Sequence, residues 1–200
     1  MKLKDRKRQD ILDAALVEFG EIGFAAARIN RIAELASVSK RTLYNHFESK
    51  EALFDAIIDK LLADARCFQI AEHDPETSIE SQLRKTAMAY LPFIEDSNHL
   101  ALARVVTSEF IRNPKMSRRL FERDRVRQGP FTNLIAEAMQ AGKLKQADAG
   151  YAATQFMASI KAFLYWPQLM AGTDLPSDEQ INKIIDDAVT MFMALYKPDK

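Results

Sequence analysis

Apolar residues recur at helical spacing along most of the chain, and short polar segments separate one apolar stripe from the next. This spacing is typical of amphipathic α-helices, and no segment shows the strict alternation of a half-buried strand. The first stripe extends from Ile11 to Phe19 and should end near Gly23, because glycine adopts the positive φ of a helix C-terminus without strain. The pattern predicts an all-α protein of about nine helices.

Polar residues with capping chemistry mark where several of the later helices should begin. Asp74-Pro75 predicts an N-cap followed by a proline in the first turn. Pro92 should then kink or end the helix that follows. Asp148 has the position of another N-cap, and Ser177 to Gln180 has the spacing of a capping box before the last apolar stripe.

The segment from Ile29 to Phe47 predicts two short helices joined by a tight turn. The apolar stripe of the first helix stops before Ser37, and Ser39 can cap the second helix by accepting a hydrogen bond from a backbone N–H. Val38 and Leu43 occupy the two positions of a hydrophobic staple, which would fix the angle at which the chain enters the second helix. Such a pair is a helix-turn-helix, whose second helix reads the major groove of DNA.

The outward face of this second helix carries groups that can bind DNA bases. Arg41, Tyr44 and Asn45 fall on one side of the helix, beside Lys40 and Thr42, with no acidic residue among them. Arginine can bind O6 and N7 of guanine, asparagine can pair with N6 and N7 of adenine, and the other side chains can reach thymine methyls or phosphates. These residues alone are compatible with a recognition helix and with a solvated helix that has a basic face.

A resemblance to a known family favours the first interpretation. ILDAALVEFGEIGF and RIAELASVSKRTLYNHFESKEALF, within residues 11–54, resemble the N-terminal domain of the TetR family of one-component transcriptional repressors. The resemblance implies a three-helix DNA-binding domain at residues 1–50 and a helical ligand-binding and dimerisation domain at residues 51–200. It implies a partner, double-stranded operator DNA, and the residues expected at the DNA are Arg28, Ser39, Lys40, Arg41, Thr42, Tyr44, Asn45, His46 and Lys50.

The chain departs from the family pattern at two places. The family often has Thr or Ser at the start of the first of the two helices, where this chain has Ala27 and Arg28, so we expect Arg28 to supply the DNA contact there. The family usually has Gly in the turn, where this chain has Ser37. Lys50 and His46 match positions that contact the DNA backbone in the family, although His46 is equally expected as a structural residue at the edge of the small core.

The charge distribution agrees with DNA contact at one end of the chain. The net charge is zero, but residues 1–50 contain ten Lys or Arg and seven Asp or Glu, and the remaining residues contain 18 and 21. Met1 to Arg8 is a basic arm that can lie along phosphates or fray as a solvated terminus. A single cysteine, no apolar run of membrane-spanning length and no secretory signal predict a cytoplasmic protein.

The C-terminal part resembles the same family through RVVTSEFIRNPKMSRRLFE and FLYWPQLMAG, which are similar to the AefR- and AcrR-like type of C-terminal domain. The resemblance implies a cavity for a small-molecule effector and a homodimer through the last two long helices, at about residues 148–170 and 177–196. Two broadly apolar helices at a C-terminus are also suited to a four-helix bundle with their twofold mates. We therefore expect a repressor that a small apolar or amphipathic molecule releases from a palindromic operator.

Aromatic and sulfur-containing side chains are the candidates for lining the effector cavity. They are Phe68, Met88, Tyr90, Phe93, Phe110, Phe156 and Trp166. The alternative is that they belong to an ordinary core, because cores consist of such stripes. Cys67 has no activating cation nearby in sequence, so an inert thiol is expected. The alternating charges between Lys115 and Arg127 are typical of a solvated helix face rather than a second nucleic-acid patch.

Two other classes of function compete with this prediction. An enzyme is disfavoured because His46, His73 and His99 lack metal-ligand spacing, and the chain has no Gly-rich phosphate loop or nucleophile motif, so we expect no metal site and no cofactor. A helical small-molecule or lipid carrier without specific DNA binding would explain residues 75–196. It would leave the residues from Lys40 to Lys50 unexplained.

Overall fold

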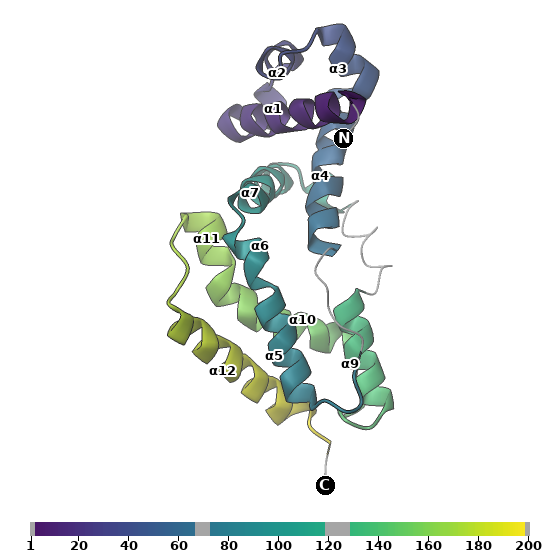
Figure 1. Cartoon of the computed structure of the whole chain (residues 1–200), viewed down its shortest axis with the longest axis vertical. Coiled ribbons are helices and arrows are strands. Elements are labelled where there is room, and N and C mark those ends of the chain that lie inside the picture. The colour runs from purple at the N-terminus through teal and green to yellow at the C-terminus, as the bar shows by residue number, and fades with distance from the viewer. Residues whose placement is uncertain (1–2, 67–72, 119–128, 199–200) are drawn as a thin grey trace. The chain divides into compact units, whose positions relative to one another are not determined.

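A computed structural model describes residues 3–66, 73–118 and 129–198, and all regular secondary structure within these ranges is helical. The chain divides into two compact units (Figure 1). The first unit contains residues 1–67 and 97–120, and the second contains residues 68–96 and 121–200. The helical fold confirms the predicted fold class.

The first unit packs three N-terminal helices against two longer ones. Its helices are α1 (Leu3–Ala26), α2 (Ile29–Leu35), α3 (Lys40–His46), α4 (Lys50–Arg66) and α7 (Ser97–Arg112). Phe19, Phe24 and Phe54 form an aromatic cluster in its core, with ring centroids 5.0–5.6 Å apart. Burial of a large apolar side chain of this kind contributes about 1.5–3 kcal/mol, so this cluster fixes α4 against α1.

Helix α1 is longer at both ends than its apolar stripe predicts. It begins at Leu3, within the basic segment, and the guanidinium of Arg8 lies 4.9 Å from the ring centroid of Phe47. The cation–π contact gives the basic turn a partner on the first unit and favours helix over a frayed arm. At the other end, Gly23 has φ 80° and ψ 160°, which kinks the helix before it resumes and ends at Ala26. This backbone conformation is essentially restricted to glycine.

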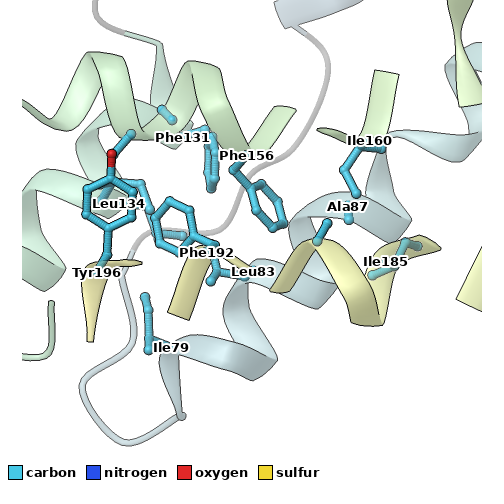
Figure 2. Close-up of a cluster of buried hydrophobic side chains, with 14 of the residues drawn as sticks. Ile79, Leu83, Ala87, Phe131, Leu134, Phe156, Ile160, Ile185, Phe192 and Tyr196 are labelled. Carbon is cyan, nitrogen blue, oxygen red and sulfur yellow. The ribbon is translucent and has the colours of Figure 1, made fainter. Parts of the chain in front are cut away.

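The second unit is a helical bundle around one apolar core. Its helices are α5 (Ile79–Ala89), α6 (Leu91–Glu95), α9 (Pro130–Gln140), α10 (Ala149–Leu164), α11 (Trp166–Ala171) and α12 (Asp178–Tyr196). Phe156 of α10 lies at the centre of this core, 5.5 Å from Phe131 and 5.6 Å from Phe192 between ring centroids (Figure 2). Aromatic pairs in these tilted and edge-on arrangements stabilise the packing of α9, α10 and α12.

The helix boundaries confirm some of the predicted caps and contradict another. Ser177 and Gln180 form the predicted capping box, and Asp148 accepts the backbone N–H of Tyr151 at 2.9 Å. The start predicted at Asp74-Pro75 is wrong, because α5 begins at Ile79 with Ser78 as its N-cap. Asp74 instead caps a separate turn: its carboxylate accepts the Glu76 N–H and the Thr77 hydroxyl, and these bonds hold the pKa of Asp74 below its usual value.

Prolines account for the difference between eleven labelled helices in the described residues and the nine expected. Pro92 and Pro167 each lie in the first turn of a short helix, α6 and α11, where a missing N–H costs nothing. Each proline therefore separates a short helix from the longer one before it. None of the described helices combines the length and the apolar composition that a membrane crossing requires.

The compact units divide the chain differently from the domains expected at residues 1–50 and 51–200. Helices α4 and α7 pack against α1 in the first unit, so this unit contains the expected DNA-binding domain and additional helices. The structure thus defines where the chain is compact. The boundary at residue 50 is a functional assignment and stays a prediction.

Candidate nucleic-acid interface

Local hydrogen bonds and the packing of a few apolar side chains stabilise the turn between α2 and α3. Ser39 is the N-cap of α3, and its hydroxyl accepts the backbone N–H of Thr42 at 3.0 Å. Val38 and Leu43 both belong to the core of the first unit, and Leu43 is fully buried. Ser37 in the turn has φ 52°, a left-handed conformation that a side chain disfavours. The predicted helix-turn-helix is therefore present, with the expected cap.

Four polar residues of α3 point away from this core. Lys40, Arg41 and Asn45 are exposed, and the Tyr44 side chain is 42% exposed. Within the described ranges, none of the four side chains makes a hydrogen bond, ion pair or ring contact with another residue. Helix α3 carries no acidic residue in its first turn, so its two cations have no counter-ion on the helix. We call these four residues the α3 face.

The other candidate DNA contacts of the helix-turn-helix are Ser39, Thr42 and His46, and their side chains are less free to bind DNA. The hydroxyl oxygens of Ser39 and Thr42 lie 2.8 Å apart, and the Ser39 hydroxyl is already engaged in the cap. Thr42 and His46 are half-buried at the sides of the helix. Their roles at DNA stay predictions, and the cap gives Ser39 a structural role.

Lys50 lies at the start of α4, but its ammonium turns towards the end of α1. Its Nζ donates to the backbone carbonyl oxygens of Phe24, Ala25 and Ala27, at 2.8, 3.2 and 3.1 Å. The same atom lies 4.8 Å from the centroid of the Phe24 ring. An ammonium has three N–H donors, so all of them are used inside the protein. The structure therefore gives Lys50 a positioning role that the sequence did not suggest.

Helix α2 begins without a side-chain cap of its own. Its N-cap is Arg28, whose backbone N–H donates to the Oε1 atom of Glu18 at 3.1 Å. Glu18 is a buried carboxylate of α1, 4% exposed, and the Arg28 side chain is exposed. Glu18 thus accepts the N–H of the N-cap residue from another helix, which is the bond that a Glu at the third helical position makes in a capping box. The signal in the sequence was a carboxylate on the apolar face of the first stripe.

The candidates for the effector cavity do not form one group. Phe68 and Cys67 lie outside the described residues, as does most of the charged segment after Arg118. Phe156 belongs to the core of the second unit, and Phe110 packs against the core of the first. Met88 is 39% exposed on α5. Their roles in ligand binding stay predictions.

Tyr90, Phe93 and Trp166 are the candidates that do gather in the second unit. The rings of Tyr90 and Phe93 stack with centroids 6.2 Å apart. Tyr165, which the sequence analysis did not select, links this pair to Trp166, with centroid distances of 6.1 Å to Tyr90 and 5.4 Å to Trp166. Burial raises the pKa of both tyrosines, so their hydroxyls stay protonated.

Across the described residues, no group of three or more His, Cys, Asp or Glu side chains has the arrangement of a metal site. His73 Nδ1 is 3.1 Å from Gln82 Oε1 in a polar cluster at the start of α5.

Two family models match the chain. Residues 11–57 match the model described as bacterial regulatory proteins, tetR family. Residues 81–198 match the model described as AefR-like transcriptional repressor, C-terminal domain. The two matches cover the helix-turn-helix and nearly all of the described second unit.

Individual relatives agree with these matches. The HTH-type transcriptional regulator RutR of Escherichia coli K12 is 48% identical over 56 residues, so the match spans 28% of this chain and about a quarter, 26%, of RutR. A TetR family transcriptional regulator from Pseudomonas syringae pv. tomato DC3000 is 37% identical, with a TM-score of 0.81 over 98% of this chain and 99% of that one. The flavonoid-responsive regulator FrrA is 28% identical, with a TM-score of 0.75 over 98% and 100% of the two chains.

Proposed function

Because this chain belongs to the TetR family of transcriptional regulators, it is a DNA-binding regulator and not an enzyme, and we propose that it is a ligand-responsive repressor. It binds a palindromic operator as a homodimer and leaves it when a small apolar or amphipathic molecule binds the second unit. The observation that carries this proposal is the α3 face, a group of exposed polar side chains without partners in the described chain.

The chemistry of the α3 face fits sequence-specific recognition. Arg41 and Asn45 have the donor and acceptor groups that distinguish guanine and adenine in the major groove. Lys40 and Tyr44 flank them and can bind phosphate or thymine methyl groups. Because the four side chains make no hydrogen bond, ion pair or ring contact within the described chain, DNA binding breaks no such interaction of these groups. Arg28 is exposed at the start of α2 and extends the basic surface.

A dimer is needed because one short helix reads only a few base pairs. The outer faces of α10 and α12 expose large apolar side chains: Phe163 is 58% exposed, and Met191 and Leu195 are each 57% exposed. Phe163 and Met191, together with Ile184, line an open, largely apolar groove of about 660 Å³. We assign the interface to these helices, within the expected ranges 148–170 and 177–196, where twofold packing would bury the exposed side chains in a four-helix bundle.

The effector is proposed from the character of the second unit, whose aromatic group around Tyr90 joins apolar rings to phenolic hydroxyls. The name of FrrA, a flavonoid-responsive regulator, describes a response to a compound of this polarity, and we extend that class to the present chain. Release from DNA is a population shift between two dimers that differ in the spacing of their α3 helices. A coupling of about 1–3 kcal/mol would lower operator affinity about 5- to 150-fold.

The proposal is tested by selecting bound sequences from a random duplex pool at two salt concentrations. An enriched inverted repeat is the expected result, because two α3 helices related by a twofold axis read the same bases in opposite orientation. Binding without an enriched motif, with a steep salt dependence, would reduce the α3 face to nonspecific phosphate contacts. Absence of binding at both salt concentrations would favour a small-molecule carrier instead.

A further inference from the structure

The second unit holds a lysine between two aromatic rings. The ammonium of Lys161, on α10, lies 5.3 Å from the centroid of the Tyr90 ring and 5.9 Å from that of Tyr165. The two tyrosine rings are themselves 6.1 Å apart at an angle of 55°, so the ammonium is near the faces of both. Phe93 stacks on Tyr90 and extends the aromatic surface. We call Tyr90, Phe93, Lys161 and Tyr165 the Lys161 cluster.

Lys161 has no acidic partner in the described part of the chain. Lys183 on α12, by contrast, is exposed and pairs with the Asp187 carboxylate. Lys161 is half-buried and faces only aromatic rings. Burial without a counter-ion disfavours its charged form, which lowers the pKa of Lys161 below its usual value. A cation in this position is stabilised by the ring quadrupoles but lacks a full negative charge.

We infer that Lys161 is the specificity-determining residue of the effector site and that it selects an amphipathic aromatic molecule with one negative charge. This inference rests on the proposed function, since it names the class of effector. The anionic group, a carboxylate, sulfonate or phenolate, pairs with the Lys161 ammonium. The aromatic body lies against Tyr90, Phe93 and Tyr165.

The chemistry of the cluster favours an anion over a cationic or a neutral ligand. A cationic ligand would place a second positive charge beside Lys161, which raises the energy of both charges in a poorly solvated site. A neutral apolar ligand would leave the ammonium as it is, without a counter-ion, and would gain only the aromatic contacts. An anion removes the electrostatic penalty that the cluster carries in the free protein, and a charge-assisted hydrogen bond to the ammonium adds directionality. The Tyr165 hydroxyl, which stays protonated, can donate a further hydrogen bond to the same anion.

The test compares two fluorescent probes that share an aromatic body and differ in charge. 8-Anilino-1-naphthalenesulfonate is an anion, and N-phenyl-1-naphthylamine is the same ring system without the sulfonate. Both are titrated into the full-length wild type and into the Lys161→Met, Lys161→Arg and Lys85→Met variants. Lys85 is an exposed lysine of α5 in the same unit and serves as the matched control.

The expected result is a loss of at least tenfold in affinity for the sulfonate in Lys161→Met, with the affinity for the neutral probe unchanged within a factor of two. Lys161→Arg should retain most of the sulfonate affinity, and Lys85→Met all of it. The neutral probe also reports whether Lys161→Met still folds, together with its helical circular dichroism. An equal loss of both probes, an unchanged sulfonate affinity, or no sulfonate binding by the wild type would each overturn the inference.

Failure of this inference is separable from failure of the proposed function. The probes report binding without DNA, whereas the operator selection reports DNA recognition without an effector. An enriched inverted repeat with a sulfonate affinity that does not depend on Lys161 would retain the repressor and remove the anionic effector. Lys161-dependent probe binding without an enriched repeat would retain the site for an anionic ligand and contradict the operator-binding repressor.

Discussion

The ammonium of Lys50 lies 2.8 Å from the carbonyl oxygen of Phe24, and it also contacts the face of the Phe24 ring. The two residues are 26 positions apart in the sequence, so this contact joins the start of α4 to the end of α1. The carbonyl groups at a helix end lack intrahelical donors, and a lysine near them is favoured by the helix dipole. Lys50 therefore stabilises the segment at the end of α1, from which the chain continues into α2 and α3.

We expect Lys50→Met to destabilise the first unit by about 1–2 kcal/mol, because a carbonyl hydrogen-bonded to a charged donor loses a strong partner. Thermal unfolding followed by circular dichroism measures this loss. Operator affinity should fall as well, through misplacement of α3. If Lys50 acted only as a phosphate contact, the affinity would fall while the unfolding temperature stayed at the wild-type value.

Lys40→Met is the matched control for this experiment. Lys40 is exposed on α3 and has no partner in the described ranges, so its removal should leave stability within about 0.5 kcal/mol of the wild type. Its effect should instead be on DNA, as a weaker affinity and a salt slope reduced by about one counterion. A large loss of stability in Lys40→Met would contradict the assignment of the two lysines to different roles.

Ser37→Gly should stabilise the protein by about 0.5–1 kcal/mol. Ser37 has φ 52°, and the left-handed conformation costs a residue with a Cβ about 1–2 kcal/mol, which exceeds the entropy that a glycine adds to the unfolded chain. Ser37→Val should act in the opposite direction, since a β-branched residue is strained further there. Thermal unfolding of the two variants checks both signs, and a stabilising Ser37→Val would refute the assigned backbone conformation.

The part of the fold that follows from local pattern could be predicted from the sequence. The Ser39 cap, the buried Leu43, the capping box at Ser177 and the split at Pro92 all depend on residues within one turn of each other. The exposed side of α3 followed from the same periodicity. These features are local, and short-range chemistry determines them.

The features that the sequence did not predict depend on contacts distant in sequence. The hydrogen bonds of Lys50 to the end of α1 are one example, because the sequence shows only its place in the first turn of α4. Its contact with a DNA phosphate stays a prediction. Glu18 accepts the N–H of the α2 N-cap residue from ten positions away, and the Arg8 guanidinium lies over the ring of Phe47. The contact between Lys161 and Tyr90 could not be predicted either, because Tyr90 lies between α5 and α6 whereas Lys161 is on α10. In each case the decisive partner is supplied by tertiary packing.

Tyr44→Ala should weaken operator binding by at least tenfold, about 1.4 kcal/mol, while effector-site binding stays unchanged. Tyr44 is 42% exposed and contributes little to the core, so the variant should fold as the wild type does. Fluorescence anisotropy of a labelled operator, with the neutral naphthylamine probe as the control for the second unit, measures both properties. Unchanged operator affinity would count against α3 as the recognition helix.

Met191→Glu should convert the dimer into a monomer. The Met191 side chain is 57% exposed on α12 and lines the groove with Phe163 and Ile184, so a twofold partner would bury the new carboxylate without a counter-ion. Sedimentation equilibrium should then give 22.7 kDa for the variant and twice this mass for the wild type. Ile111→Glu is the matched control, because Ile111 is 69% exposed on α7 of the first unit and lies outside the assigned interface. A dimeric Met191→Glu, or a monomeric Ile111→Glu, would place the interface elsewhere. A monomeric Met191→Glu should also lose the preference for an inverted repeat over a single half-site. The reason is that the second half-site contributes to binding only when two recognition helices are linked.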